Sequence, residues 1–224
     1  MGVDVIQLKP HQEYFYVIVF KKLAPLSAVV LCEGQSDAEV TKRILKKMES
    51  EGVIRGISLK VGFADVGGRD NVPTMLDAIL SLTRSSRRLK DIVVVIDGDE
   101  YSVDERVKSI VDSLTSREAL IEGLQRDSVC NQVYVSRVTV DRRSLRLLIA
   151  VNGNYSMPSK RRCLEDHCVK LMGIRVVEDV ESSKQLVSVK ECLEHIEKAG
   201  AGRVCEAFHH ICRVFQIMLS ETTG

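Results

Sequence analysis

The chain has 224 residues, 45% apolar and 28% charged, and its 32 basic side chains nearly balance 31 acidic ones. This length supports a sizeable hydrophobic core in one or two domains, and we expect a single domain spanning 1–224. The balanced charge excludes a highly charged disordered chain, and any attraction to nucleic acid must be local. No apolar run approaches the roughly 18 residues of a membrane span. The N-terminus lacks the layout of a secretion signal, so we expect a cytoplasmic protein that contacts no membrane.

The first half of the chain shows alternating signals for strands and helices. Residues 13–20 are aromatic and β-branched, which indicates a strand. Residues 28–32 form a continuous apolar run, typical of a strand buried on both faces. A helix is predicted to begin at Ser36 and to continue to about residue 51. A strand over 57–63 and a helix over 71–83 follow.

The second half repeats this alternation and then becomes helical. Residues 92–96 form a second continuous apolar run, and a long helix is predicted from about 103 to 125. Two further strands, 133–140 and 145–151, are compatible with a hairpin. From about residue 160 the pattern is mostly helical.

This order of elements predicts the fold class. Strands and helices alternate from residue 28 to about 140, which favours an α/β fold with a largely parallel, Rossmann-like sheet. Ligands of such sheets bind at the carboxyl ends of the strands. The polar residues that directly follow the two apolar runs are therefore the first candidates for chemistry.

Acidic residues follow both runs. Glu33 comes after the first run, with Asp37 in the first turn of the next helix, and Asp97 and Asp99 come after the second. Asp97 and Asp99 are two residues apart and point to one side while strand geometry lasts. Clustered acids repel one another, and a divalent cation offsets that cost. Oxygen ligands suit Mg²⁺ or Mn²⁺, and Mg²⁺ commonly binds through carboxylates plus substrate phosphates, which indicates phosphoryl-transfer chemistry.

These segments resemble the Toprim domain of topoisomerases, bacterial-type primases, ribosomal-RNA maturases and overcoming-lysogenization-defect (OLD) nucleases. The resemblance is carried by Val29-Val30-Leu31-Cys32-Glu33-Gly34 and Val94-Val95-Ile96-Asp97-Gly98-Asp99. It implies that Glu33 acts as an acid/base or metal ligand and that Asp97 and Asp99 bind the metal. The catalytic set is then Glu33, Asp97 and Asp99.

Three weaker matches are similar to small OLD-like Toprim proteins. They are Glu33-Gly34-Gln35-Ser36-Asp37, Val66-Gly67-Gly68-Arg69-Asp70-Asn71 and Leu164-Glu165-Asp166. The first implies that Asp37 also holds metal. The third implies the same for Glu165, although a solvent-facing helix surface explains Glu165 and Asp166 equally well. The Toprim-like core would cover about 27–170, with a helical extension over 171–224.

Several residues are candidates for binding phosphate. Gly67 and Gly68 precede a predicted helix and could hold a phosphate through backbone N–H groups, or could simply form a turn. Arg69 lies beside them, and Lys160 and Arg161 belong to one of three basic clusters. The clusters are Arg84 with Arg87 and Arg88, Arg142 with Arg143 and Arg146, and Lys160 with Arg161 and Arg162. Each is also compatible with a solubilising surface, and the low aromatic content offers little stacking surface for single strands.

The seven cysteines include no C-x-x-C pair, and we predict that they are packed thiols. Cys205, His209 and Cys212 share one face of a predicted helix, which is compatible with core packing or with a zinc site. His167 is interpreted as a packed or surface histidine rather than a base.

The leading hypothesis is a Mg²⁺-dependent Toprim-like nuclease that acts on DNA or RNA. A primase-like nucleotidyl transfer stays open, as does a phosphatase of the haloacid-dehalogenase type, because Asp97-Gly98-Asp99 is similar to its nucleophile and acid. A non-catalytic metal-binding module is the third alternative. Its protein partner would dock on the amphipathic helices predicted over 187–196 and 204–218, which could equally complete the core.

Overall fold

The computed structural model describes residues 2–8, 25–54, 59–82, 86–140, 143–176 and 179–220. The strand predicted over 13–20 lies outside this part of the chain, as do Arg84 and Arg142. The strands are β1 Val3–Leu8, β2 Ala28–Cys32, β3 Leu59–Asp65, β4 Asp91–Asp97, β5 Leu120–Arg126, β6 Val133–Val140, β7 Arg143–Asn152, β8 Ser159–Arg161 and β9 Val180–Ser182. The α-helices are α2 Gln35–Ser50, α3 Val72–Leu82, α4 Val103–Thr115, α5 Leu164–Met172, α6 Val189–Lys198, α7 Ala201–Ala207 and α8 His209–Ser220. Two short 3₁₀ helices are η1 Arg69–Asn71 and η3 Ser183–Gln185.

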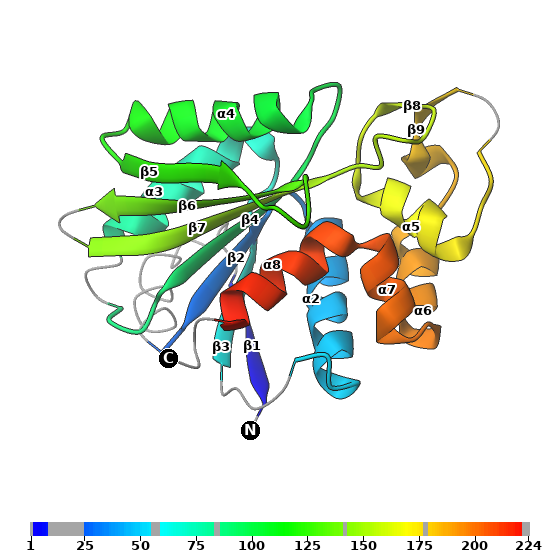
Figure 1. The fold of residues 1–224 in the computed structure, drawn as a ribbon, viewed down its shortest axis with the longest axis horizontal. Coiled ribbons are helices and arrows are strands. Elements are labelled where there is room, and N and C mark those ends of the chain that lie inside the picture. The colour runs from blue at the N-terminus through cyan, green and yellow to red at the C-terminus, as the bar shows by residue number, and fades with distance from the viewer. Residues whose placement is uncertain are drawn as a thin grey trace.

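A seven-stranded sheet with the order β1-β3-β2-β4-β7-β6-β5 forms the centre of the molecule (Figure 1). β6 runs antiparallel to both of its neighbours, whereas the other pairs in this sheet are parallel. The prediction of an α/β fold with a largely parallel, Rossmann-like sheet is confirmed. The predicted strands over 28–32, 57–63 and 92–96 correspond to β2, β3 and β4, and the predicted hairpin is β6–β7.

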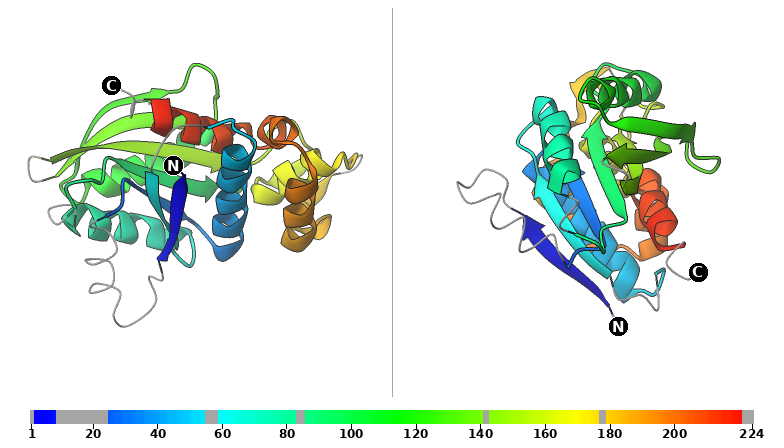
Figure 2. Two further views of the ribbon diagram at one scale, coloured as in Figure 1. Left: turned by 90° about the horizontal axis from the view of Figure 1, so that it is seen from below. Right: turned by 90° about the vertical axis from the view of Figure 1, so that its left-hand side faces the viewer.

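The helices cover both faces of the sheet (Figure 2). Val29 and Leu31 of β2 pack in the same cluster as the apolar side chains of α3 and α4, and Val30 packs on the opposite face with those of α2 and α8. This alternation follows from the two-residue period of a strand, and burial on both faces explains the continuous apolar runs. α5, α6 and α7, with the small β8–β9 sheet, gather at one end of the central sheet (Figure 1).

The long helix predicted over 103–125 is wrong, because α4 ends at Thr115 and residues 120–126 form β5. The chain turns at Glu118, which has a left-handed backbone with φ of 66°. The following residues then pair with β6 in an antiparallel ladder that shifts register between Glu122 and Gln125. An exposed edge strand lacks the apolar periodicity that identifies a buried strand, so local propensity was misleading here.

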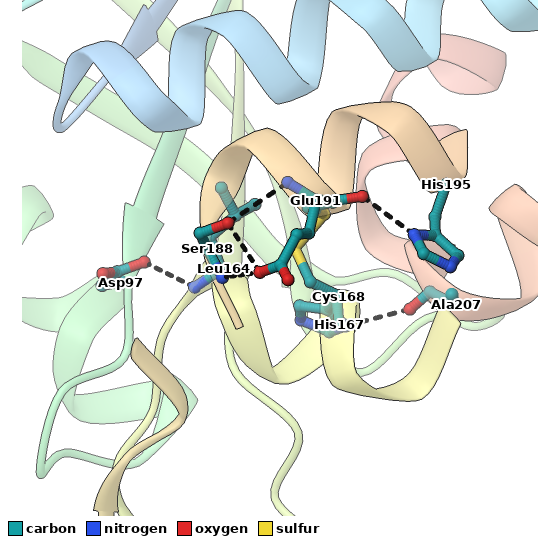
Figure 3. Close-up of a disulfide and its surroundings, with 9 residues drawn as sticks. Asp97, Leu164, His167, Cys168, Ser188, Glu191, His195 and Ala207 are labelled. Atoms are coloured by element: carbon teal, nitrogen blue, oxygen red, sulfur yellow. Dashed lines mark hydrogen bonds between the residues drawn. A yellow bond between two sulfur atoms is a disulfide. The ribbon is translucent and has the colours of Figure 1, made fainter. Parts of the chain in front are cut away.

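The cysteine prediction holds for part of the set. Cys32, Cys130 and Cys163 are buried free thiols, as predicted. For the other four it is wrong, because disulfides join Cys168 to Cys192 and Cys205 to Cys212. The first links α5 to α6 (Figure 3), and the second spans the break between α7 and α8. Since Cys205 and Cys212 are bonded to each other, they do not form the zinc site considered above.

The helical C-terminal third is confirmed, and the apolar faces of its helices complete the core. Cys192 and Ile196 of α6, and Val214 and Phe215 of α8, are buried. Among the described residues, no helix combines the length and the apolar character needed to cross a membrane.

Candidate functional site at the carboxyl ends of the strands

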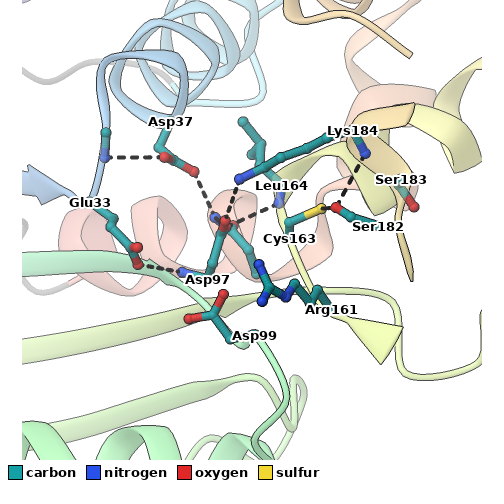
Figure 4. A network of polar contacts seen from close by, with 12 residues as sticks. Glu33, Asp37, Asp97, Asp99, Arg161, Cys163, Leu164, Ser182, Ser183 and Lys184 are labelled. Atoms are coloured by element: carbon teal, nitrogen blue, oxygen red, sulfur yellow. Dashed lines mark hydrogen bonds and ion pairs between the residues drawn. The ribbon is translucent and has the colours of Figure 1, made fainter. Parts of the chain in front are cut away.

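Acidic residues meet at the carboxyl ends of the parallel strands, and Figure 4 shows Glu33, Asp37 and Asp97 among them. The register pairs Cys32 of β2 with Val95 of β4, so Glu33 and Asp97 come to the same edge of the sheet. Asp37 and Glu165 come from the first turns of α2 and α5. Together they border a cavity of about 410 Å³. Its charged lining residues are Glu33, Asp37, Asp65, Asp97, Glu165 and Lys184. We call this cavity the acidic pocket.

Asp97 is the centre of this pocket. Its Oδ1 accepts hydrogen bonds from Asn152 Nδ2 at 3.0 Å and from the Leu164 backbone N–H at 3.1 Å. Its Oδ2 lies 3.4 Å from the Lys184 ammonium. One carboxylate therefore joins the end of β4 to β7, α5 and η3, and its orientation is fixed by three separate elements.

Asn152, at the end of β7, connects two of the acids. Its fully buried amide donates from Nδ2 to Asp37 Oδ1 and to Asp97 Oδ1, both at 3.0 Å. Its Oδ1 lies 2.8 Å from His210 Nε2, which fixes which end of the amide faces the carboxylates. Asn152 was not predicted from the sequence, where its one signal is its place at the end of an apolar strand. In the structure it is in register with Asp97.

Glu33 is held against the backbone of β4. Its Oε2 accepts the Asp97 N–H at 3.2 Å and lies 3.4 Å from Arg106 Nη2. Arg106, on α4, also donates from Nε to the Asp97 carbonyl at 2.9 Å. This buried arginine was missed too, because nothing in the sequence of α4 marks it out from the other basic residues.

Asp99 does not face the same way as Asp97, which corrects the expectation that the pair points to one side. β4 ends at Asp97, and Asp99 has a left-handed backbone with φ of 51°, so the strand alternation stops between them. The Asp99 carboxylate accepts from Arg69 Nη1 at 3.2 Å and lies 3.9 Å from Arg106 Nη2. Asp99 is outside the lining of the acidic pocket, although it stays next to it (Figure 4).

Gly98 allows this change of direction, and Gly98→Ala is expected to disturb it. A Cβ there would lie 2.4 Å from the Tyr155 hydroxyl and 3.0 Å from the Asn152 carbonyl oxygen. We expect a loss of about 1–3 kcal/mol in the free energy of unfolding, measured by urea denaturation. Gly202→Ala is the matched control, because open space surrounds that helical position. Equal stability of the two variants would contradict the close packing described here.

Glu165 is buried, with only 5% of its surface exposed, so the alternative of a solvent-facing helix surface is wrong. Its Oε2 has no hydrogen-bond partner among the described residues. Asp166 is fully buried and points elsewhere, accepting from the Ser183 hydroxyl and the Asn154 N–H. The packed interpretation of His167 is confirmed, because Nε2 accepts the Gly153 N–H and Nδ1 contacts the Ala207 carbonyl (Figure 3).

Burial keeps these acids from ionising readily. Removal from water raises the pKa of Asp97 to about 6, although Lys184 and Asn152 oppose the change. It also raises the pKa of Asp37 well above its usual range, with the Asp97 charge as the second cause, and raises that of Glu33. The pocket therefore favours the binding of a cationic side chain or a metal cation among these carboxylate oxygens.

Lys184 supplies part of that charge. Burial lowers the pKa of its ammonium, but the charges of Asp97 and Glu165 raise it by more, so Lys184 stays protonated. Within the described residues, no three His, Cys, Asp or Glu side chains are grouped as a ready metal site. The Asn152 amide and the Lys184 ammonium bond Asp97 instead, and Lys184 was invisible in the sequence because its segment has no recognisable motif.

The predicted phosphate-binding residues have mixed positions. Gly67 and Gly68 line the acidic pocket, but their N–H groups already donate to Asp65 Oδ1 and to the Glu33 carbonyl, so they are not free to cradle a phosphate. Arg69 is next to the pocket, where its guanidinium donates a hydrogen bond to Asp99.

The described residues of the basic clusters are not among the lining residues of the acidic pocket. Lys160 pairs with Glu181, and Arg161 pairs with Glu100 and Glu181. Arg146 binds Asp91 at the opposite end of β4, so it has a structural role there.

Comparison with known proteins identifies one family. A family model described as a protein of unknown function (DUF3226) matches residues 27–210. No curated protein and no solved structure matches the chain.

Proposed function

We propose that this chain, which belongs to the DUF3226 family, is a nuclease that uses Mg²⁺ or Mn²⁺ to hydrolyse phosphodiester bonds of DNA or RNA. The observation that carries the proposal is the acidic pocket. Five acids line it, and the buried Oε2 of Glu165 lacks a hydrogen-bond partner among the described residues. A buried oxygen of this kind costs free energy unless a ligand satisfies it.

The donor set fits a hard divalent cation. Glu33, Asp37, Asp97 and Glu165 offer carboxylate oxygens, which Mg²⁺ and Mn²⁺ prefer, and no thiol or imidazole is among the described residues that line the pocket. Burial is the main reason for the raised pKa values of Asp37 and Asp97, and the charges of neighbouring acids add to it, a repulsion that a cation would relieve. These four residues would hold the metal, and the Lys184 ammonium would give up its place beside Asp97.

The chain's own residues would then position the substrate. A bound divalent cation supplies charge neutralisation at the phosphate and activation of a water molecule. Arg69 and Arg106, now paired with Asp99 and Glu33, stand at the edge of the pocket where they can hold phosphate oxygens. Glu33 is the candidate to accept or donate a proton, because its raised pKa brings it closer to neutrality. Lys184 provides a further charge for the phosphate.

Two alternatives have less support in the geometry. A haloacid-dehalogenase-type phosphatase would need Asp97 and Asp99 to face the same phosphate, and Asp99 is turned onto two arginines instead. The non-catalytic module depended on amphipathic helices that could dock a partner, and the apolar faces of α6 and α8 are buried within the fold. Primase-like nucleotidyl transfer needs the same metal site. The assay described below distinguishes synthesis from hydrolysis.

The affinity for metal is expected to fall below about pH 6. The pKa of Asp97 in the folded protein, about 6, lies above its usual value, so between about pH 4 and 6 the folded state holds a proton that the unfolded chain has released. Without metal, stability therefore decreases as pH rises through this window. Metal must displace the proton, so the Kd for Mn²⁺ should increase about tenfold per pH unit below pH 6 for one proton. Calorimetric titrations at several pH values between 5 and 8 measure this, and a flat profile would argue against Asp97 as a ligand.

Cleavage assays test the proposal directly. Purified protein is incubated with end-labelled single- and double-stranded DNA and RNA, in Mg²⁺, Mn²⁺ or EDTA. We expect cleavage that needs metal and disappears in the Asp97→Asn/Asp99→Asn variant. A parallel reaction with nucleoside triphosphates detects synthesis, which would favour the primase-like alternative. Metal binding without cleavage of any of the four polymers would contradict the nuclease proposal.

A further inference from the structure

A second cavity lies next to the acidic pocket, on the α3–α4 face of the sheet. Its volume is about 550 Å³, within the range of roughly 300–1,000 Å³ typical of small-ligand sites. α3 and α4 run side by side above this face (Figure 1), and Ile96 at the end of β4 contributes to the lining. We call this cavity the α3–α4 cleft.

Two arginines connect the cleft to the acidic pocket. Arg69 and Arg106 line the cleft, and the same guanidinium groups reach Asp99 at 3.2 Å and Glu33 at 3.4 Å. A phosphate held beside the acids would therefore lie against these arginines, at the mouth of the cleft. The group attached to that phosphate can extend into the cleft.

The lining of the cleft combines an aromatic ring, an apolar floor and hydroxyl groups. Tyr101 is 45% exposed and borders the cleft. Val72, Ile96 and Ile110 form a buried apolar floor, and Ser109 and Ser113 place two hydroxyl groups one turn apart on α4. This lining matches a flat, partly apolar ring that has polar edges and is attached to a sugar. It matches a plain anion less well, because Asp70 and Glu105 also line the cleft and repel negative charge.

A second exposed tyrosine lies beside Tyr101. Among the described residues, two tyrosines have more than a third of their surface exposed, Tyr101 at 45% and Tyr155 at 39%. The two residues are neighbours, because the Tyr155 hydroxyl donates to the Tyr101 backbone carbonyl at 3.3 Å. The Arg162 guanidinium lies over the Tyr155 ring at 5.6 Å. Stacking on exposed aromatic rings and arginines is a common way to hold unpaired bases.

We propose that the α3–α4 cleft binds the nucleoside attached to the scissile phosphate, with its base against Tyr101 and its phosphate at Arg69 and Arg106. This inference rests on the proposed function and specifies its substrate: an unpaired nucleotide, because a base inside a duplex is stacked and does not reach such a cleft. The nuclease would therefore act on single strands, ends or loops in preference to continuous duplex.

Calorimetric titration of the full chain in Mn²⁺ tests the cleft, with the four nucleoside 5′-monophosphates and, as a ligand without a base, ribose 5-phosphate. We expect at least one nucleotide to bind about tenfold more tightly than ribose 5-phosphate, the size of one stacking contact. Ser109→Trp should fill the cleft and remove this difference, while leaving the affinities for Mn²⁺ and ribose 5-phosphate unchanged. Thr115→Trp, at an exposed position of α4 outside the cleft, is the matched control.

The possible results separate this inference from the proposed function. Equal affinities for nucleotides and ribose 5-phosphate, or nucleotide binding that Ser109→Trp does not weaken, would overturn the role of the cleft while metal binding and cleavage still support the nuclease. Failure to bind nucleotides together with failure to bind Mn²⁺ would overturn both. Tyr101→Ala gives a second readout, because it should lower nucleotide affinity without introducing bulk into the cleft.

Discussion

Asp97→Asn is expected to stabilise the metal-free protein while abolishing metal-dependent cleavage. Burial holds the pKa of Asp97 at about 6, so near pH 7.5 the folded state contains an ionised carboxylate that water would solvate better. The amide keeps an oxygen that can accept from Asn152 and Leu164 but removes this charge. We expect the free energy of unfolding to rise by about 1–2 kcal/mol, since one pKa unit corresponds to about 1.4 kcal/mol and burial of the neutral amide also carries a cost.

The same substitution should remove the response to metal. Mn²⁺ is expected to raise the melting temperature of the wild-type chain and to leave that of Asp97→Asn nearly unchanged, because binding to the folded state alone stabilises it. Cleavage should fall by about 10³-fold, the upper end of the scale seen when a main electrostatic group is lost. Asp112→Asn, on the exposed side of α4, removes an equal charge and should behave like wild type. A variant that is less stable and still shifted by Mn²⁺ would show that Asp97 is structural.

The fold was largely predictable from the sequence because its central strands are buried on both faces. β2 and β4 appear as unbroken apolar runs, and the acids that end them mark the functional edge of a parallel sheet. β5 was not predictable, since an exposed edge strand is specified by its partner and not by its own pattern. The direction of Asp99 was also hidden, because it depends on how Gly98 fits against Tyr155 and the Asn152 carbonyl.

Two of the residues missed at the site, Asn152 and Lys184, reach it from a distant part of the chain. Asn152 bonds Asp37 across 115 residues, and Lys184 meets Asp97 across 87. An isolated Asn or Lys in a sequence carries no sign of such a contact. The acids were found because they sit directly after strands, where the register of the sheet fixes their position; the groups that balance their charge come from helices and short turns packed later in the chain.

Lys184→Met is expected to tighten metal binding and yet slow cleavage. The ammonium lies 3.4 Å from Asp97 Oδ2, in the place where a cation would meet that carboxylate, so Lys184 and metal compete for it. Without the lysine, the remaining acids repel one another more strongly and attract a cation more, and we expect the Kd for Mn²⁺ to fall by roughly tenfold. The metal-free protein should lose less than about 1 kcal/mol, because the lysine side chain is more than half exposed.

Cleavage by Lys184→Met should fall by about 10²-fold even at saturating metal, since the displaced ammonium would no longer be available to the phosphate. Lys190→Met removes the same charge from an exposed position on α6 and should change neither quantity. Calorimetry and cleavage rates at saturating Mn²⁺ separate the two effects. Weaker metal binding with unchanged cleavage would mean that Lys184 does not compete with the metal for Asp97. Lys184 would then stabilise the metal site without lying in it.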